Sequence, residues 1–394
     1  MTVLMSYFNS PISGEWGGEA DDSTNGVPVL RTTNFTEDGR LSYDDLTYRF
    51  IDTEKKKKKI LQPGDIIIEK SGGTPKKPVG RCVYFEREDG KRYFCNNFTA
   101  ILRANTDEVN TKYLWYLLQE RYRTRQCLKY QYKTNGIANL DIKDYLSHIE
   151  VDLPPKKVQD RRVKALDYIQ HLLDLHKKLL EILDYAVKSQ FIEMFGSEKD
   201  NTKKYPIQKI GDFSECYPGA TPSTKKKEYW EGGKIPWMSS GEVYKEHIYD
   251  TEQKITDAGY KNASTKMVPP HSIVIALAGQ GRTRGTVAIN EIELCTNQSL
   301  CAVIPNNNVV LTDYLFQDLK NRYEELREMS TVPGGRGGLS LTIINKVPVL
   351  VPPLERQQAY VDMIHQSDKS KSTIQRSLDN LNELREGLLQ EYFG

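Results

Sequence analysis

Apolar side chains recur at alternating steps of three and four residues in two long stretches of the chain. The first stretch follows Pro154-Pro155, and the second follows Pro352-Pro353. This spacing is typical of a coiled-coil seam, so each stretch predicts a helix of about 40 residues, about 60 Å long. Complementary seams predict that the two helices pack against each other, antiparallel. The seam positions are Leu166, Ile169, Leu173, Leu180, Leu183 and Val187 in the first stretch, and Ile364, Ile374, Leu378, Leu381 and Leu388 in the second.

The two seams are not uniformly apolar. His176 lies on the first seam, where we expect its side chain to pack rather than to bind a ligand. Ser367 and Lys371 make the beginning of the second seam polar, which predicts that the helices splay or meet a partner there. A second apolar stripe predicts that the first helix is covered on more than one side. Its members are Leu172, Leu175, Leu179 and Ile182.

The helical stretches belong to a duplication that runs through most of the chain. Residues 154–159 correspond to residues 352–357 at an offset of 198. Cys95-Asn96-Asn97 corresponds to Cys295-Thr296-Asn297 at an offset of 200, so the frame is kept while the loops differ in length. A repeat of this length is a duplicated module and not a solenoid unit. The internal pseudo-two-fold that it creates suits a target with two halves.

Outside the helical stretches, short β-branched and aromatic runs between turn residues predict strands at 66–68, 81–85, 272–277 and 285–289. Amphipathic helices are predicted around residues 114–118 and 315–319. The fold class is therefore α+β, with two pseudo-symmetric mixed α/β domains separated by two long antiparallel coiled-coil helices. The expected boundaries are 1–153 for the first domain, 154–196 for the central helix, 197–204 for a linker, 205–351 for the second domain and 352–394 for the C-terminal helix.

Composition narrows the class of protein. The 394 residues include 55 Lys or Arg and 53 Asp or Glu, a formal net charge of +2. This near-neutral charge argues against a non-specific DNA coat, whereas local basic clusters still permit site-specific binding. Six cysteines without a C-x-x-C pair indicate neither a zinc site nor a redox motif, and they fit a reducing cytosol. No signal peptide and no apolar run long enough for a bilayer is recognisable, so a cytoplasmic protein is expected.

Motifs for catalysis are mostly missing. An amino-methyltransferase would need Asp/Asn-Pro-Pro-Tyr/Phe, whereas the Pro-Pro pairs here follow Leu153 and Val351. No G-x-x-x-x-G-K-[ST] phosphate loop occurs. The carboxylates around Glu69-Lys70 lack the spacing of a nuclease, and residues 279–285 lack the spacing of a dinucleotide loop. The six histidines show no spacing of metal ligands.

Two glycine-containing loops, at residues 71–74 and 279–281, are the best candidates for a binding site. Each follows a predicted strand and can present main-chain N–H groups to an anion. Neighbouring Lys and Arg side chains would neutralise phosphates, while Arg, Asn and Gln can read base edges. The candidate DNA-binding residues are Arg31, Asn34, Lys70, Ser71, Gly72, Thr74, Lys76, Lys77, Arg81, Asn97, Tyr132 and Lys133 in the first half, and Ser239, Ser240, Gln280, Arg282, Arg284, Asn297, Gln298 and Arg336 in the second.

A set of motifs, most specific in the second half, adds a resemblance. They are Lys209-Ile210-Gly211-Asp212, Gly219-Ala220-Thr221-Pro222-Ser223, Glu228-Tyr229-Trp230, Ile235-Pro236-Trp237-Met238-Ser239-Ser240-Gly241-Glu242, Thr296-Asn297-Gln298-Ser299, and Pro352-Pro353-Leu354-Glu355-Arg356-Gln357 with a degenerate copy at 154–159. With these motifs the chain resembles the DNA-specificity subunit of a Type I restriction-modification system. The resemblance spans essentially the whole chain, although the first half lacks the Lys-Ile-Gly-Asp opening.

The resemblance implies two target-recognition domains, each reading one half of a bipartite sequence in double-stranded DNA. It implies that the paired helices set the length of the unread spacer and dock two methyltransferase subunits, with motor–nuclease subunits joining for restriction. The chain itself would be non-catalytic and would bind no cofactor or metal. Its partners would use S-adenosylmethionine, ATP and Mg²⁺.

Two other classes of protein stay open at this point. One is a two-lobed coiled-coil scaffold for protein interactions, which sequence-insensitive or absent DNA binding would favour. The other is a stand-alone DNA methyltransferase, which activity of the purified chain with S-adenosylmethionine would support.

Overall fold

The computed structural model describes residues 2–20, 25–197, 199–279, 281–330 and 338–394. The chain forms two compact units. The first comprises Met1–His176 and Arg376–Gly394, and the second comprises Lys177–Gln375. Each unit therefore contains a globular part and a portion of each long helix.

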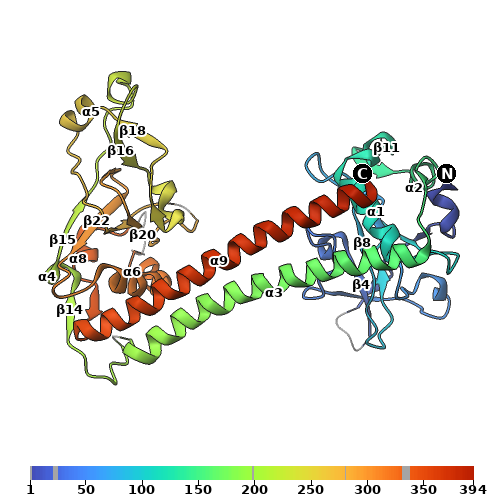
Figure 1. The fold of residues 1–394 in the computed structure, drawn as a ribbon, viewed down its shortest axis with the longest axis horizontal. Coiled ribbons are helices and arrows are strands. Elements are labelled where there is room, and N and C mark those ends of the chain that lie inside the picture. The colour runs from blue at the N-terminus through green and yellow to red at the C-terminus, as the bar shows by residue number, and fades with distance from the viewer. Residues whose placement is uncertain (1, 21–24, 198, 280, 331–337) are drawn as a thin grey trace. The chain divides into compact units, whose positions relative to one another are not determined.

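The two predicted helices are α3 (Lys156–Phe195) and α9 (Leu354–Phe393), each of 40 residues (Figure 1). Each begins directly after a Pro-Pro pair, because proline at a helix start sacrifices no internal hydrogen bond. Gly196 follows the last residue of α3 with φ +76°, and its N–H donates to the carbonyl of Ile192 (2.8 Å). Glycine adopts this left-handed conformation without a Cβ clash, so it ends the helix.

Within each unit, the portions of α3 and α9 pack in antiparallel order. In the first unit, Leu166 near the start of α3 shares a buried cluster with Phe393 at the end of α9. In the second unit, Phe195 at the end of α3 shares a buried cluster with Tyr360 near the start of α9. The predicted antiparallel pairing is confirmed.

All of the predicted seam positions are shielded from solvent, some of them fully and the others in part. Such burial of leucine and isoleucine is the main force that holds two amphipathic helices together. Leu166, Ile169, Leu173, Val187 and Leu378 are buried, while Leu180, Leu183, Ile364, Ile374, Leu381 and Leu388 are half-buried.

The polar seam positions are bridged from one helix to the other. In the first unit, Nε2 of His176 lies 3.1 Å from the hydroxyl of Ser377. In the second unit, the ammonium of Lys371 lies 2.6 Å from a carboxylate oxygen of Asp184. His176 is thus a packing residue, as predicted, and Lys371 has an acidic partner on α3.

The second apolar stripe of α3 is not covered as predicted. Leu172 is half-buried, but Leu175 is 44% exposed in the first unit, and Leu179 and Ile182 are 45% and 51% exposed in the second. The reason is geometric, because α9 and the globular part of each unit occupy the other faces of the helix. An isolated sequence window shows only that a face is apolar, not whether another element meets it.

The described residues in the globular part of the first unit form four small sheets. One has the order β2 (Ile12–Ser13), β10 (Thr99–Leu102), β6 (Ile66–Glu69), β8 (Cys82–Tyr84) and is antiparallel. A second has the order β3 (Gly18–Glu19), β5 (Thr47–Phe50), β4 (Val27–Leu30), β9 (Phe94–Cys95), with β4 and β9 parallel. The others are β11 (Gln131–Thr134), β12 (Ile137–Leu140), β7 (Ser71–Gly72), and the pair β1 (Thr2–Val3) with β13 (Glu150–Val151).

The second unit repeats this arrangement with changes. Its main sheet has the order β15 (Ser214–Pro218), β22 (Leu300–Pro305), β19 (Ser272–Ala276), β20 (Val287–Asn290), β17 (His247–Ile248), with β17 and β20 parallel. Its second sheet is β18 (Gln253–Ile255), β16 (Ile235–Met238), β21 (Cys295–Thr296), with β16 and β21 parallel. β14 (Ile207–Lys209) pairs with β23 (Pro348–Leu350). The four predicted strands correspond to β6, β8, β19 and β20.

Helices cover the sheets at matching positions. In the first unit α1 (Thr111–Arg123) and α2 (Ile142–Ser147) enclose the core. In the second unit α6 (Thr312–Asn321) and α8 (Leu341–Asn345) do the same, and α7 (Tyr323–Met329) follows α6. The short helices α4 (Ile210–Phe213) and α5 (Asp257–Asn262) complete the second unit. Helices α1 and α6 contain the two predicted amphipathic segments.

Each unit has a buried glutamine at the start of its long helix, and the two glutamines make equivalent contacts. Gln357 donates to the carbonyl of Pro352 (2.8 Å) and accepts from the N–H of Leu311 (2.8 Å). Gln159 donates to the carbonyl of Pro154 (2.8 Å) and accepts from the N–H of Asn110 (2.9 Å). The duplication therefore extends to individual hydrogen bonds, which join the start of each long helix to the loop before α1 or α6.

Candidate nucleic-acid interface

In the first unit, the loops that follow β4, β6 and β9 meet. Strands β4 and β9 are parallel, and the N–H of Asn96 donates to the carbonyl of Leu30 (2.9 Å). The N–H groups of Lys70 and Ser71 both donate to the carbonyl of Phe98 (2.9 and 3.1 Å). The first-half candidates that come from these loops therefore share one surface, although they are far apart in the sequence.

Three candidates on this surface already have partners. Asn34 is buried, accepts from the N–H of Arg31 (2.9 Å) and donates to the carbonyl of Asp45 (3.0 Å). Arg31 also donates to the carboxylate of Asp45 (2.8 Å). Arg81 donates to both carboxylate oxygens of Glu69 (2.8 and 3.3 Å). Asn34 thus positions the loop, while the two guanidinium groups are held in place by carboxylates.

The glycine loop of the first unit connects the hairpin strands β6 and β8. Gly72 and Gly73 have φ values of +108° and +69°. Two hydrogen bonds between Thr74 and Lys77 close the loop. The N–H of Thr74 donates to the carbonyl of Lys77 (2.7 Å), and the N–H of Lys77 donates to Oγ1 of Thr74 (3.0 Å). Positive φ values and this tight turn suit glycine, which leaves the backbone open to an approaching phosphate.

The lysines of this region differ in their surroundings. Lys76 is exposed, whereas Lys77 forms an ion pair with Glu37 (2.9 Å). Lys70 donates to the hydroxyl of Ser13, and burial lowers the pKa of Lys70 below its ordinary value. A phosphate would return the pKa of Lys70 toward that value by favouring the charged form.

The remaining first-half candidates are exposed. Asn97 follows β9, and Tyr132 and Lys133 lie on β11. The sheet β11, β12, β7 joins this strand to the glycine loop, because β7 is formed by Ser71 and Gly72. Tyr132 and Lys133 therefore belong to the same surface region as the loop.

In the second unit, the glycine loop occupies the equivalent hairpin, between β19 and β20. Tyr323 donates to the carbonyl of Arg282 (3.0 Å), and Arg327 donates to the carbonyl of Gly281 (2.6 Å). The hydroxyl of Tyr244 lies 2.6 Å from that of Thr283. The loop backbone is thus held from two sides, while the side chain of Arg282 is exposed and that of Arg284 is half-buried.

The other second-half candidates lie at the ends of β16 and β21. Ser239 donates from its N–H and its hydroxyl to the buried carboxylate of Glu242 (2.9 and 3.2 Å), and Ser240 is half-buried. The N–H of Asn297 donates to the carbonyl of Met238 (3.0 Å), which brings the two strand ends together. Gln298 is exposed and accepts from the hydroxyl of Thr221. Two further candidates, Gln280 and Arg336, lie outside the described residues.

Several side chains beside these candidates are not among the predicted DNA-binding residues. Thr221 and Tyr244 bond to Gln298 and to the glycine loop of the second unit. Asn139, on β12, accepts from the hydroxyl of Ser71 (2.6 Å). The Asn135-Gly136 pair is a strong hairpin signal that would have placed Asn139 opposite Tyr132.

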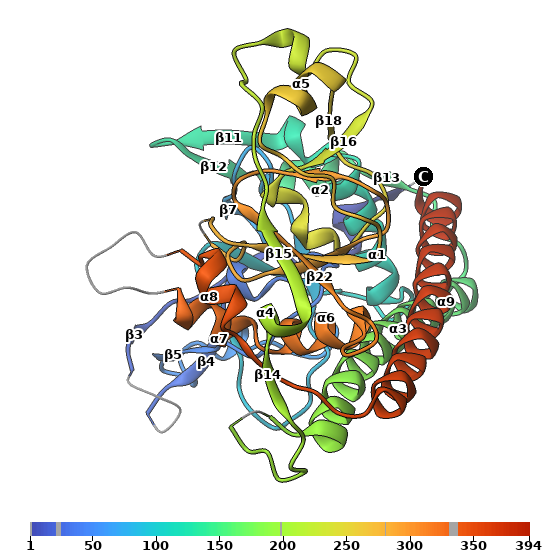
Figure 2. The same cartoon turned by 90° about the vertical axis from the view of Figure 1, so that its left-hand side faces the viewer.

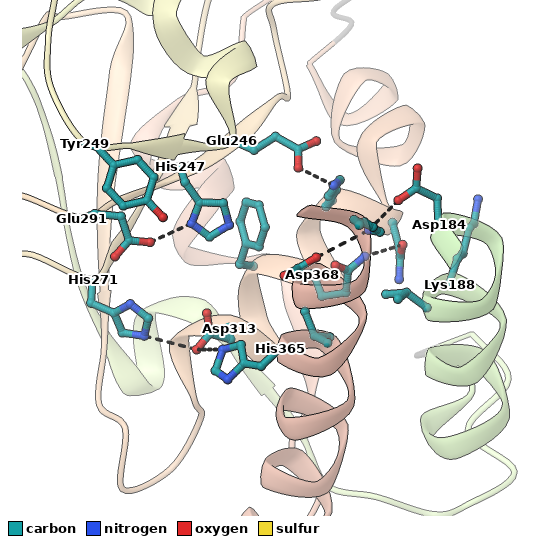
Figure 3. A pocket seen from close by; sticks show the side chains of 17 residues that line it. Asp184, Lys188, Glu246, His247, Tyr249, His271, Glu291, Asp313, His365 and Asp368 are labelled. Carbon is teal, nitrogen blue, oxygen red and sulfur yellow. Dashed lines mark hydrogen bonds and ion pairs between the residues drawn. The ribbon is translucent and has the colours of Figure 1, made fainter. Parts of the chain in front are cut away.

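A polar cavity of about 890 Å³ lies in the second unit, lined by parts of α3, α6 and α9 and by residues around β17 and β20 (Figure 3). His271 and His365 both point toward Asp313, at 3.3 and 3.8 Å, and His247 lies 2.7 Å from Glu291. The hydrogen bond with Asp313 raises the pKa of His271. Among the described residues, no three His, Cys, Asp or Glu side chains are grouped so that they could hold a metal ion. The lining combines these histidine–carboxylate contacts with the apolar side chains of Val187, Phe316 and Ile364.

No helix in the described ranges is both long and apolar enough to cross a bilayer. Glycine loops, basic side chains and amides lie at equivalent strand ends of the two units. Main-chain N–H groups and basic side chains suit phosphates, and amides and arginines suit base edges.

Comparisons with known proteins agree with this geometry. Residues 17–184 and 202–384 match the family model described as Type I restriction modification DNA specificity domain. The specificity subunit of the Escherichia coli Type I restriction enzyme EcoR124I/EcoR124II is 27% identical over 185 residues, 46% of each chain, so the match spans less than half of that relative. A putative Type I restriction enzyme MjaX specificity subunit from Methanocaldococcus jannaschii is 22% identical over 91% of this chain and 86% of its own.

Solved structures show the same fold. The S subunit of a Type I restriction-modification system from M. genitalium superposes with a TM-score of 0.61 and 16% identity, covering 100% of this chain and 95% of that one. The family model, matched twice in succession, covers most of the chain. The protein therefore belongs to the family of Type I restriction-modification DNA specificity domains.

Proposed function

We propose that this chain recognises a bipartite sequence in double-stranded DNA, with residues 1–153 reading one half-site and residues 205–351 reading the other. The observation that carries the proposal is the glycine loop at the same hairpin in both units, β6–β8 and β19–β20. Basic side chains and amides from neighbouring strand ends surround each loop. Two weak half-site affinities in one chain reinforce each other, because binding of the first raises the effective concentration of the second.

The long helices would serve as the docking site for two methyltransferase subunits. Leu179 and Ile182 on α3 stay about half exposed in the second unit, and Tyr185 on the same helix is 74% exposed. Apolar side chains at such spacing form a surface that a partner helix can cover. In this arrangement α3 and α9 would also fix the length of the unread spacer.

Catalysis would belong to the partners. The methyltransferase subunits would use S-adenosylmethionine, and motor–nuclease subunits would use ATP and Mg²⁺ for restriction in the cytoplasm. Adenine methylation requires that the target base leave the duplex and enter the pocket of a methyltransferase. The chain must therefore tolerate distorted DNA between its two domains.

Co-expression with a Type I methyltransferase subunit, followed by mapping of methylated adenines on genomic DNA, tests the proposal. The expected result is a split motif with a fixed spacer. Methylation by the purified chain alone would contradict the proposal and favour a stand-alone methyltransferase. A stable complex that methylates nothing and binds DNA without regard to sequence would favour a protein-interaction scaffold.

A further inference from the structure

The first unit carries a hairpin, β11–β12, whose turn is fixed by two residues. Asn135 and Gly136 have φ values of +50° and +79°, the pattern of a two-residue type I′ turn. Thr134 pairs with Ile137 across the turn. Figure 2 shows the strands β11 and β12 as a projecting ribbon. Because the register is set by the turn, the side chains that share a face of the ribbon are known.

One face of this ribbon continues onto the glycine loop. Tyr132 pairs with Asn139, and Asn139 pairs with Ser71 on β7, so the three side chains form a row across the sheet. Thr134 and Ile137 form the next row on the same face. Tyr132 is 55% exposed and Ile137 is 46% exposed, whereas Leu140 on the opposite face is buried. The row therefore lies on the outward face of the sheet.

The amide of Asn139 is oriented by two hydrogen bonds. Its Nδ2 donates to the carbonyl of Ile137 (3.0 Å), and its Oδ1 accepts from the hydroxyl of Ser71 (2.6 Å). A carbonyl can only accept, so the contact with Ile137 fixes which end of the amide is the nitrogen. An asparagine amide has two N–H donors and two acceptor lone pairs. One donor and one lone pair remain, which is the set that reads N6 and N7 of adenine.

The segments that form this face carry basic side chains, and the neighbouring carboxylates of Glu69 and Glu37 are paired with Arg81 and Lys77. Residues 70–81 and 125–140, which supply the sheet and its flanks, contain no acidic residue. Arg125, Lys129 and Lys133 on and beside the hairpin are exposed. The next residue, Asp141, caps α2 by accepting from the N–H of Asp144 (3.0 Å). A face of this charge favours a polyanion over an acidic or neutral protein surface.

In the second unit, the corresponding segment lies between α6 and α8. Between α6 and α8, its described residues form the helix α7, which holds the glycine loop through Tyr323 and Arg327. Among the described residues, this hairpin is found in the first unit, and variable loops on a kept frame are common sites of recognition.

We propose that the outward face of β7, β11 and β12 enters a groove of duplex DNA and reads part of the first half-site. Asn139 would contact a base edge, with adenine as the best match, while Tyr132 and Ile137 would pack against a thymine methyl group or sugars. A two-stranded ribbon fits the major groove. The assignment rests on the proposed function, and it adds Asn139 and Ile137 as specificity-determining residues.

The test compares Asn139→Ala and Tyr132→Ala in the full chain, each co-expressed with its methyltransferase subunit, by adenine-methylation mapping and by duplex binding. The variants are expected to lose about tenfold or more in discrimination at one or two positions of the first half-site. The second half-site should keep its sequence, which also shows that the chain is folded. Phe50→Ala is the matched control, because this aromatic side chain is 63% exposed on β5 of the same unit and lies neither on a long helix nor among the candidate DNA-binding residues. It should leave the motif unchanged.

The outcomes separate the two proposals. A wild-type complex without a bipartite motif overturns both. A wild-type bipartite motif that both variants reproduce, with unchanged preference at every position, overturns the hairpin proposal alone. Equal weakening of both half-sites by Tyr132→Ala also overturns it, because Tyr132 lies in the first unit.

Discussion

Replacement of Gln357 by alanine should destabilise the second unit strongly and locally. Gln357 is fully buried and makes three hydrogen bonds, from the N–H of Leu311 and to the carbonyls of Val309 and Pro352. A buried polar group that loses its partner costs about 1–3 kcal/mol. Because the three groups are partly or fully buried, we expect a loss of about 3–5 kcal/mol in local stability.

Hydrogen–deuterium exchange of the full chain measures this loss where it occurs. Backbone amides near Leu311 should exchange about a hundredfold faster or more, since each 1.4 kcal/mol is about a factor of ten. Gln159→Ala in the first unit removes two hydrogen bonds, with the N–H of Asn110 and the carbonyl of Pro154, where Gln357→Ala removes three. Its effect should therefore be about 1 kcal/mol smaller and centred on Asn110.

The adjacent Gln358 provides the matched control. Its side chain is exposed and donates only to Asp362 on the same helix face (2.8 Å), so Gln358→Ala should change local stability by less than about 0.5 kcal/mol. If Gln357→Ala and Gln358→Ala gave the same exchange rates near Leu311, the buried glutamine would not be what joins α9 to the loop before α6.

Three further predictions concern DNA, the helices and pH. Arg282→Ala removes an exposed guanidinium from the second glycine loop and should weaken binding through the second half-site only; equal loss with duplexes altered in either half-site would contradict this. Removing one heptad from both α3 and α9 shortens each by about 10 Å, so methylation mapping should show a spacer shorter by about three base pairs, and an unchanged spacer would show that the helices do not set it. The hydrogen bond with Asp313 raises the pKa of His271 above 6.5. The contribution of protonated His271 to the free energy of unfolding is therefore complete below pH 6.5 and is lost as the pH rises through the folded-state pKa. The denaturation midpoint of Asp313→Asn should therefore vary less with pH than that of the wild type.

The candidate surface shows how far local patterns reach. Clusters of glycine, lysine and arginine in the sequence predicted both loops, and the two loops lie at equivalent hairpins of the structure. The same patterns could not show that Asn34 is buried or that Arg81 is held by Glu69, because both facts depend on side chains from other strands. Asn139 was missed although its hairpin has a clear turn signal, since its importance comes from its cross-strand neighbours Ser71 and Tyr132.

The sequence by itself determined the elements and the duplication. Heptad spacing, Pro-Pro pairs and Gly196 defined α3, because periodicity and backbone restriction act within a few residues. Only the tertiary structure decided into which core the end of each long helix packs. The ring of Phe195 lies 5.0 Å from that of Tyr314, while the ring of its repeat counterpart Phe393 lies 4.8 Å from that of Tyr113. Each long helix therefore starts in one unit, and its end completes the core of the other unit. The two copies of the repeat carry equivalent contact residues. The local sequence therefore cannot distinguish this arrangement from one in which each helix packs within its own repeat.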